Sequence, residues 1–186
     1  MFVVRKAFID DLPVMLEIYA RSRQFMKEQG NESQWGLPSP GKKLWPSEEA
    51  LKVNIAAGTQ YVLEFRLEAG SERALNAASV TVAATFCYTR GHDPLYDTIY
   101  DGTWPDNDDY GVLHMMASSG AVRGVGQAVF AWTLEQCPTL RIDTHPNNRP
   151  MRSLLEKSGF VYCGKVNMYS VQNDDVTRVC YIKKAT

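Results

Sequence analysis

The sequence predicts an α+β fold in which helices pack on a mixed sheet as an α/β sandwich. The chain has 186 residues, 45% of them hydrophobic and 22% charged, which suits one globular domain with a core of ordinary depth. Segments with helical spacing alternate with segments rich in Val, Thr, Phe and Tyr, most regularly in the C-terminal half. No internal repeat or linker divides the chain, so we expect a single domain over residues 1–186.

The N-terminal half begins with an alternating segment, residues 2–8, that is typical of a strand. Asp10 or Asp11 is expected to cap a helix that ends near Gly30. Residues 31–46 contain too many Gly and Pro residues for regular structure.

Ser47 is expected to start a second helix, which runs to Ala57, and residues 68–78 to form a polar connection between two strands. The remaining strands are expected at residues 61–67, 79–89, 110–117, 140–144, 160–166 and 176–182, and the remaining helices at residues 124–136 and 148–158.

The composition gives no sign of several classes of partner. The formal net charge is −1 and the isoelectric point about 6.3, so neither a nucleic acid nor an anionic membrane is indicated. We find no signal-peptide pattern, and no run reaches the ~20 apolar residues of a membrane span. The four cysteines are scattered without metal-binding spacing, so we expect buried, reduced thiols in a cytoplasmic protein.

Residues 111–127 carry the chemical signal, because a strand leads through a glycine turn into an amphipathic helix. The first N–H groups of a helix lack internal partners and favour an anion, and glycine lets a ligand approach the backbone. This arrangement predicts a pyrophosphate site, to which Arg123 can add a charged contact. It is not a Walker loop, which needs G-K-S/T, nor a dinucleotide fingerprint, which needs a third glycine.

Two blocks resemble the GNAT superfamily of acyltransferases. Ala121-Val122-Arg123-Gly124-Val125-Gly126 is similar to its acetyl-CoA loop, Q/R-x-x-G-x-G/A, with Ala at the first position. The segment from Asn148 to Phe160 is similar to the signature N-x-x-A-x-x-L-Y-x-K-x-G-F, with Leu155 in place of the tyrosine. Residues 30–35 and 93–104 also look like a bacterial subgroup of mostly unassigned substrate.

The resemblance implies a mixed, mostly antiparallel sheet of six or seven strands, with the fourth and fifth strands splayed and about four flanking helices. It implies that acetyl-CoA binds in the splay, where strand main-chain groups meet the pantetheine amides. It also suggests a homodimer. The residues expected to bind the cofactor are Met115, Met116, Ser118, Val122, Arg123, Gly124, Val125, Gly126, Gln127 and Asn148.

Acetyl transfer requires a neutral amine, and deprotonating a lysine-like amine of pKa ~10.4 near pH 7 costs about 4 kcal/mol. The candidate catalytic residues are His114, His145 and Asp143, with the pair Asp108 and Asp109 as further candidate bases. The alternatives are a structural hydrogen bond for His114 and a turn-organising role for His145. The tyrosine that often protonates the thiolate would fall at Leu155, so another group or water supplies that proton, or the thiolate leaves unaided.

Residues 90–109 form a long loop with six aspartates, either functional or simply solvated. The acceptor pocket is expected to be lined by Trp35, Trp104 and Asp109. The alternative for the two tryptophans is that they cover the hydrophobic core. The predicted function is acetyl-CoA-dependent N-acetylation of a small-molecule amine. The alternatives are acetylation of a protein N-terminus or lysine, and a non-catalytic acyl-CoA-binding or sensing module.

Overall fold

The computed structural model describes residues 1–32, 34–36, 44–67, 80–106, 108–168 and 177–185. The strands are β1 (Phe2–Lys6), β2 (Gln60–Arg66), β3 (Val80–Arg90), β4 (Gly111–Ser118), β5 (Thr139–Thr144), β6 (Val161–Asn167) and β7 (Thr177–Lys184). The helices are α1 (Leu12–Glu28), α2 (Glu48–Ala56), α3 (Val125–Gln136) and α4 (Arg149–Lys157), with short 3-10 turns η1 (Ile9–Asp11) and η2 (Pro94–Tyr96). These elements lie close to the predicted ranges.

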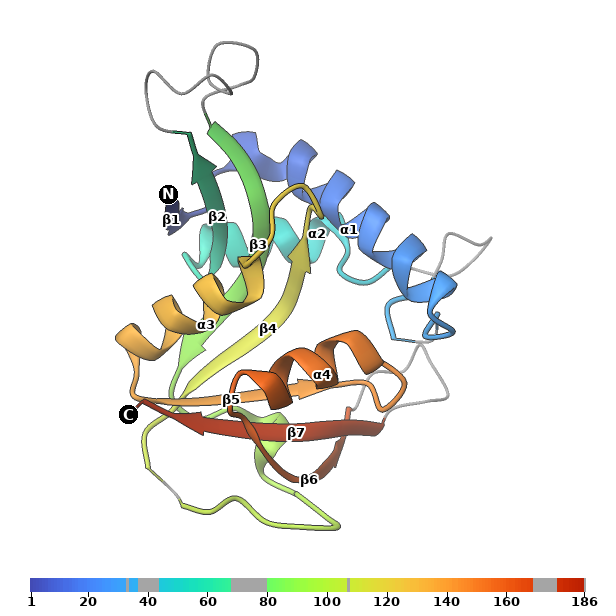
Figure 1. Ribbon diagram of the computed structural model, residues 1–186, viewed down its shortest axis with the longest axis vertical. Coiled ribbons are helices and arrows are strands. Elements are labelled where there is room, and N and C mark those ends of the chain that lie inside the picture. The colour runs from blue at the N-terminus through green and yellow to red at the C-terminus, as the bar shows by residue number, and fades with distance from the viewer. Residues whose placement is uncertain (33, 37–43, 68–79, 107, 169–176, 186) are drawn as a thin grey trace.

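The described strands form one sheet in the order β1-β2-β3-β4-β5-β7-β6 (Figure 1). Neighbouring strands are antiparallel except β4 and β5, which are parallel. Their ladder covers only Gly111–Leu140, Val112–Arg141 and Leu113–Ile142, and beyond it β4 turns away from β5. The predicted mixed sheet with a splayed fourth and fifth strand is confirmed.

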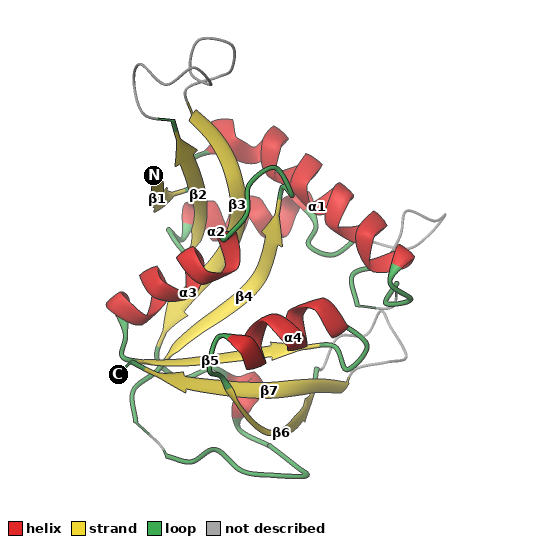
Figure 2. Cartoon of the chain, in the orientation of Figure 1, coloured by secondary structure: helices red, strands yellow, loops and turns green. Residues whose placement is uncertain are grey.

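Helices cover both faces of this sheet (Figure 2). On one face α3 and α4 pack on a core that includes Leu113, Val129 and Leu155. On the other face α1 and α2 pack on a core that includes Tyr19 and Val62. A third, smaller core lies beneath η2, so the loop between β3 and β4 covers the lower part of the α1 face.

Local signals explain most helix boundaries. The Ser47 hydroxyl accepts a hydrogen bond from the N–H of Ala50, 3.1 Å away, so this cap is as predicted. Asp11 occupies the N-cap position of α1 but makes no capping bond there. Its carboxylate instead accepts hydrogen bonds from Arg5 and from the N–H of Phe8, so the predicted capping role is wrong.

The expected connection over residues 68–78 lies outside the described residues, as does most of the Pro-rich part of the segment 31–46.

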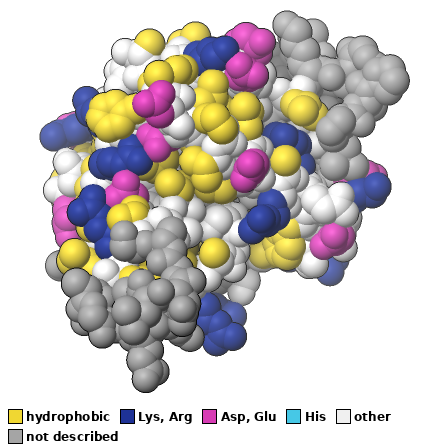
Figure 3. Space-filling view, turned by 90° about the horizontal axis from the view of Figure 1, so that it is seen from above, with side chains coloured by type: hydrophobic (Ala, Val, Ile, Leu, Met, Phe, Trp, Pro, Cys, Tyr) yellow, Lys and Arg dark blue, Asp and Glu magenta, His cyan; other side chains and the backbone are white. Residues whose placement is uncertain are grey.

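All four cysteines are buried and free, as expected. In the described ranges we find no helix with the length and apolar character of a membrane span. Figure 3 shows charged side chains of both signs interspersed on the face uppermost in Figure 1, in keeping with the small net charge.

Candidate active site

The site is built around a distortion of β4 at the point where the strand leaves β5. Met115 has a φ of 53°, which is uncommon for a residue with a side chain, and the β3–β4 register shifts nearby, between Thr85 and Cys87. The buried Tyr19 hydroxyl of α1 donates a hydrogen bond to the Met115 carbonyl, 2.8 Å away. Helix α1 therefore holds the bulge in place from one face of the sheet.

The turn from β4 into α3 supplies backbone N–H groups. Gly124 has a φ of 81° and precedes Val125, and no side chain caps the first turn of α3. The Ser118 hydroxyl accepts from the N–H of Gly120 and so shapes the turn. Arg123 is exposed and makes no ion pair to any described residue. This geometry suits an anion at the α3 N-terminus.

Other residues expected at the cofactor site have packing roles. A Cβ on Gly126 would lie 2.6 Å from Leu154 Cδ2, so this glycine lets α3 approach α4. Val122 and Met116 pack against the core on the α3 face, and Met115 against the core under α1. Gln127 lies exposed in the first turn of α3.

Asn148 joins two parts of the site. Its side-chain oxygen accepts from the N–H of Met151 and caps α4, while its Nδ2 donates to Gln34 Oε1, 2.9 Å away. Gln34 also accepts from Asn31 Nδ2. These bonds tie the segment after α1 to the start of α4, across the divergence of β4 and β5.

His114 lies at the centre of a polar group that we call the His114 cluster, consisting of Asp93, Tyr96, His114 and Asp143. His114 Nε2 lies 2.8 Å from Asp93 Oδ2, and Nδ1 lies 3.4 Å from Asp143 Oδ1. The Tyr96 hydroxyl donates to the same Asp143 oxygen at 2.9 Å. The cluster lies on the face of β4 opposite α3, because Val112, two residues before His114, belongs to the core beneath η2.

The charges in this cluster fix the state of the imidazole. Burial disfavours the imidazolium, but hydrogen bonds to Asp143 and Asp93 outweigh this effect and raise the pKa of His114 to about 10. The His114 hydrogen bond in turn lowers the pKa of Asp93. At neutral pH His114 is therefore a cation between two carboxylates, so it cannot accept a proton, and the cluster carries net negative charge.

His145 lies in the turn that follows β5. His145 is fully buried, and its Nδ1 accepts a hydrogen bond from the N–H of Asn147, 3.1 Å away. These contacts match the alternative in which it organises the turn after β5.

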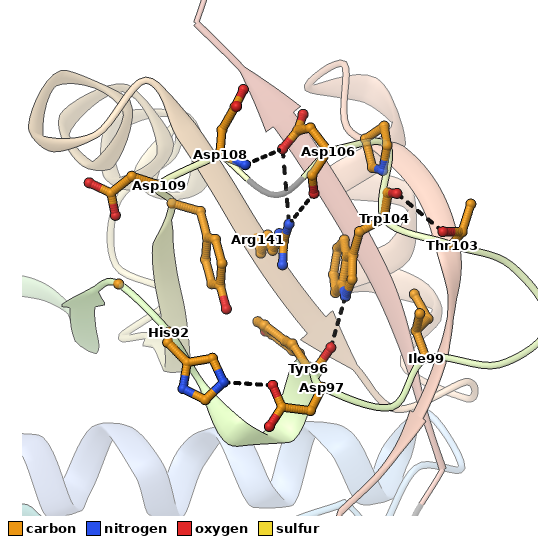
Figure 4. Close-up of a pocket in the computed structure, with 13 residues that line it drawn as sticks. His92, Tyr96, Asp97, Ile99, Thr103, Trp104, Asp106, Asp108, Asp109 and Arg141 are labelled. Carbon is orange, nitrogen blue, oxygen red and sulfur yellow. Dashed lines mark hydrogen bonds and ion pairs between the residues drawn. The ribbon is translucent and has the colours of Figure 1, made fainter.

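Trp104 and Asp109 line a different cavity of about 640 Å³, between the β3–β4 loop and the sheet (Figure 4). Its centre is Arg141, whose guanidinium carbon lies 4.3 Å from the ring centroid of Trp104 and 3.8 Å from that of Tyr110. Asp109 pairs with Arg90 at the rim.

Trp35 instead lies buried against Tyr19, at 5.5 Å between ring centroids, so the three predicted wall residues do not form one pocket.

The aspartates of the long loop are all paired within the chain. Their partners include His114 for Asp93, His92 for Asp97 and Lys184 for Asp108. The other pairs are Asp101–Lys165, Asp106–Lys184 and Asp109–Arg90. Five of these six carboxylates fix the loop to strand residues, whereas the Asp97–His92 pair lies within the loop. Only Asp93 of the loop takes part in the His114 cluster.

The sequence did not single out Tyr19, Asp93 or Tyr96. Tyr19 lies in an ordinary amphipathic pattern, and Asp93 is one of six aspartates in its loop, so neither had a distinguishing signal. The segment 93–104 was marked only by its resemblance to a bacterial subgroup. Tyr162, a strand residue close in sequence to Leu155, is 45% exposed on β6 and does not pack inward.

Comparisons with known proteins agree with this geometry. No protein-family model matches the chain, and no curated protein is similar enough in sequence to match it. Among solved structures, a GNAT-family acetyltransferase from Streptococcus agalactiae is 28% identical and has a TM-score of 0.76, with 100% of this chain and 96% of that chain covered.

Two more distant structures show the same fold. A GNAT-family acetyltransferase from Listeria monocytogenes is 16% identical with a TM-score of 0.59, covering 98% of this chain and 94% of that one. The ribosomal-protein-S18-alanine N-acetyltransferase from Escherichia coli is 14% identical with a TM-score of 0.53, covering 100% and 95%.

The splayed parallel pair, the uncapped helix N-terminus beside it and these likenesses define an acyltransferase. More specifically, the chain belongs to the GNAT superfamily and is an acetyltransferase in the broad sense that its structural neighbours share. Enzymes of this superfamily generally use acetyl-CoA.

Proposed function

We propose that this chain is an acetyl-CoA-dependent N-acetyltransferase that acetylates a small-molecule amine. The observation that carries the proposal is the His114 cluster, which has net negative charge and lies where β4 leaves β5. Its carboxylates are only partly exposed, 21% for Asp93 and 8% for Asp143, so their attraction for an ammonium group is weakly screened. The α3 N-terminus lies on the opposite face, so amine and cofactor would approach from different sides.

The β4–α3 region fits acetyl-CoA. The N–H groups of Val125, Gly126 and Gln127 would hold the pyrophosphate, with Arg123 as an exposed cation beside them. Main-chain groups of β4 beyond Leu113 have no partner strand on the β5 side among the described residues, so they would bind the pantetheine amides as an added strand does. The bound cofactor supplies the acetyl thioester.

The reaction forms a nitrogen–carbon bond as the carbon–sulfur bond breaks. An acceptor that arrives as an ammonium ion loses two protons; one ends on the departing thiolate and the other in solvent. His114 is protonated at neutral pH, so we assign proton acceptance to the carboxylates, with Asp143 the principal candidate, directly or through water. His114 and Tyr96 orient Asp143. Leu155 is buried in the core and has no proton to donate, so the proton for the CoA sulfur would come from water or from another group.

The tie between Gln34 and Asn148 supports a small acceptor. This hydrogen bond spans the divergence of the two strands on the side from which the amine would approach. The β3–β4 loop also folds over the same face, where η2 brings Tyr96 to Asp143. An open groove for a peptide is therefore not favoured.

The test combines cofactor binding with turnover. Acetyl-CoA and CoA should raise the melting temperature whereas ATP and NAD should not, because a ligand that binds only the native state stabilises it. With acetyl-CoA and a panel of small amines, wild type should release CoA thiol. Asp143→Asn should lower kcat/KM at least about tenfold, the scale of lost acid–base catalysis. Asp101→Asn, on the β3–β4 loop at an exposed ion pair with Lys165, is the matched control and should stay within about twofold.

Three results would contradict the proposal. Stabilisation by acetyl-CoA without thiol release from any amine would indicate an acyl-CoA-binding module. An equal shift from ATP would indicate a general nucleotide site. Equal losses in both aspartate variants would remove the His114 cluster from the mechanism.

A further inference from the structure

Arg23 of α1 is a buried cation without an anionic partner. Its side chain lies on the inner face of the helix and the residue is only 6% exposed. Its one hydrogen bond to a described residue is from Nη1 to the carbonyl of Trp45, at 3.5 Å, and no carboxylate in the described part of the chain lies within ion-pair distance. Burial lowers the pKa of Arg23, as expected for a charge removed from water without compensation.

Two other arginines that lie partly or wholly inside, Arg5 and Arg141, are compensated. Arg5 contacts the carboxylates of Asp11 and Glu64. Arg141, 4% exposed, stacks on two aromatic rings and lies 4.0 Å from an Asp106 oxygen. Because an unpaired buried charge is costly, Arg23 requires an explanation that these residues do not.

A second buried polar group, with one atom unpartnered among the described residues, lies in the segment that directly follows α1. The side chain of Asn31, just after α1, is 99% buried, and its Oδ1 has no hydrogen-bond partner. Its Nδ2 donates to Gln34, which in turn accepts from Asn148. Helix α1 and the segment after it thus offer an unpaired guanidinium and an unpaired acceptor oxygen beside the tie that crosses the splay.

The position of Arg23 identifies the side of the sheet that its anion would occupy. Arg23 follows Tyr19 by one helical turn, and Tyr19 holds the Met115 carbonyl at the bulge. Figure 1 shows the C-terminal half of α1 extending past the end of β4 toward the side where β5 and α4 lie. Helix α3, whose N-terminus would hold pyrophosphate, is on the opposite face. An anion at Arg23 therefore belongs to the acceptor and not to the cofactor pyrophosphate.

We propose that Arg23 binds a carboxylate of the acceptor, so that the substrate class is amines that also carry a carboxylate, such as amino acids. The inference rests on the proposed function. The acceptor's ammonium group faces the negative His114 cluster while its carboxylate pairs with Arg23, both on the α1 side of the sheet. The carboxylate compensates the buried guanidinium, which accounts for an arginine that has no acidic partner among the described residues.

The experiment measures CoA release from acetyl-CoA with a panel of amino acids and with the carboxamide of each. The proteins are wild type, Arg23→Met and Lys27→Met. Lys27 is the matched control, because it lies one turn further along α1 and is exposed. Wild type should prefer at least one amino acid over its carboxamide by about tenfold or more in kcat/KM, and Arg23→Met should reduce that ratio to about one. Lys27→Met should leave it unchanged.

The outcomes separate this inference from the proposed function. If wild type acetylates carboxamides or simple amines as well as amino acids, or if Arg23→Met lowers both rates equally, the carboxylate assignment is overturned while the acetyltransferase stands. If no amine of either kind releases CoA, the proposed function fails first. Melting temperatures provide a fold check: Arg23→Met should melt at or above wild type because it removes an unpaired buried charge, and a lower melting temperature would indicate a structural role.

Discussion

The protonation state of His114 is open to a direct test, by changing Asp93 to Asn. The wild-type imidazole lies between two carboxylates, 2.8 Å from Asp93 and 3.4 Å from Asp143. We expect it to stay protonated from pH 5.5 to about pH 9. The Asn side chain keeps the shape of the contact but removes one negative charge, so the pKa of His114 should fall.

The expected fall in the pKa of His114, and the stability linked to it, can be worked out from the raised pKa of the wild-type imidazole. Hydrogen bonds to Asp143 and Asp93 outweigh desolvation and raise the pKa of His114 to about 10, against an ordinary value near 6.5. By linkage this corresponds to roughly 3 to 5 kcal/mol of stability, present in full below pH 6.5 and lost as the pH rises toward 10. Losing the Asp93 charge removes a charge-assisted hydrogen bond of about 1.5 to 3 kcal/mol, which lowers the pKa by about one to two.

The assay is an NMR titration of the imidazole signals, which is simple because the chain has 3 histidines. His114→Asn assigns the signal. Urea unfolding of wild type and Asp93→Asn at pH 6.5 and pH 9.5 gives the matching free energies, and the difference between the proteins should shrink at the higher pH. A wild-type His114 signal that titrates near pH 6.5 would refute the reasoning and restore His114 as a candidate base.

Two further predictions concern the scaffold of the site. Tyr19→Phe removes the hydroxyl bonded to the Met115 carbonyl, so the free energy of unfolding in urea should fall by about 1 to 2 kcal/mol and kcat should fall by a larger factor than KM rises. An unchanged free energy of unfolding together with an unchanged kcat would mean that the bulge does not need this bond. Gly126→Val forces a Cβ against Leu154 and should lower the free energy of unfolding by about 1 to 3 kcal/mol. Adding Leu154→Ala to the same chain should recover part of this loss, whereas strictly additive free energies in the double-mutant cycle would exclude the contact.

Local sequence signals predicted most of the helices and strands of the fold. Helix α4 illustrates why, because Asn148 at its N-cap, an apolar stripe and Gly159 after its end are all local features. The splay of β4 and β5 has no local signal of this kind. It arises from pairing between residues far apart, with Tyr19 holding Met115 across 96 positions, and only the likeness to a known family indicated it.

The site was predicted less completely than the fold. His114 and Asp143 were named individually, and the structure brings them together, but Asp93 and Tyr96 reach them only because the β3–β4 loop folds back over the sheet. His145 was named for its place in the sequence, whereas its full burial depends on tertiary packing. The cofactor residues, the homodimer and the cytoplasmic location stay predictions.

In the proposed function, the anionic cofactor and the cationic acceptor bind on opposite faces of the sheet, and their opposite charges explain this arrangement. The anionic pyrophosphate of the cofactor would bind at the positive end of α3, whereas an ammonium acceptor would bind at the negative His114 cluster. If the two sites lay on one face, the positive charge at one would weaken the binding of the ammonium group at the other, and the negative charge would weaken the binding of pyrophosphate. The seven-stranded sheet lies between the two sites except where β4 and β5 separate. A positive charge without an acidic partner is therefore unexpected on the acceptor face, where His114 and Arg141 each have one, and yet Arg23 is buried there with no carboxylate partner among the described residues. It is consistent with that arrangement only if the acceptor brings a negative charge of its own.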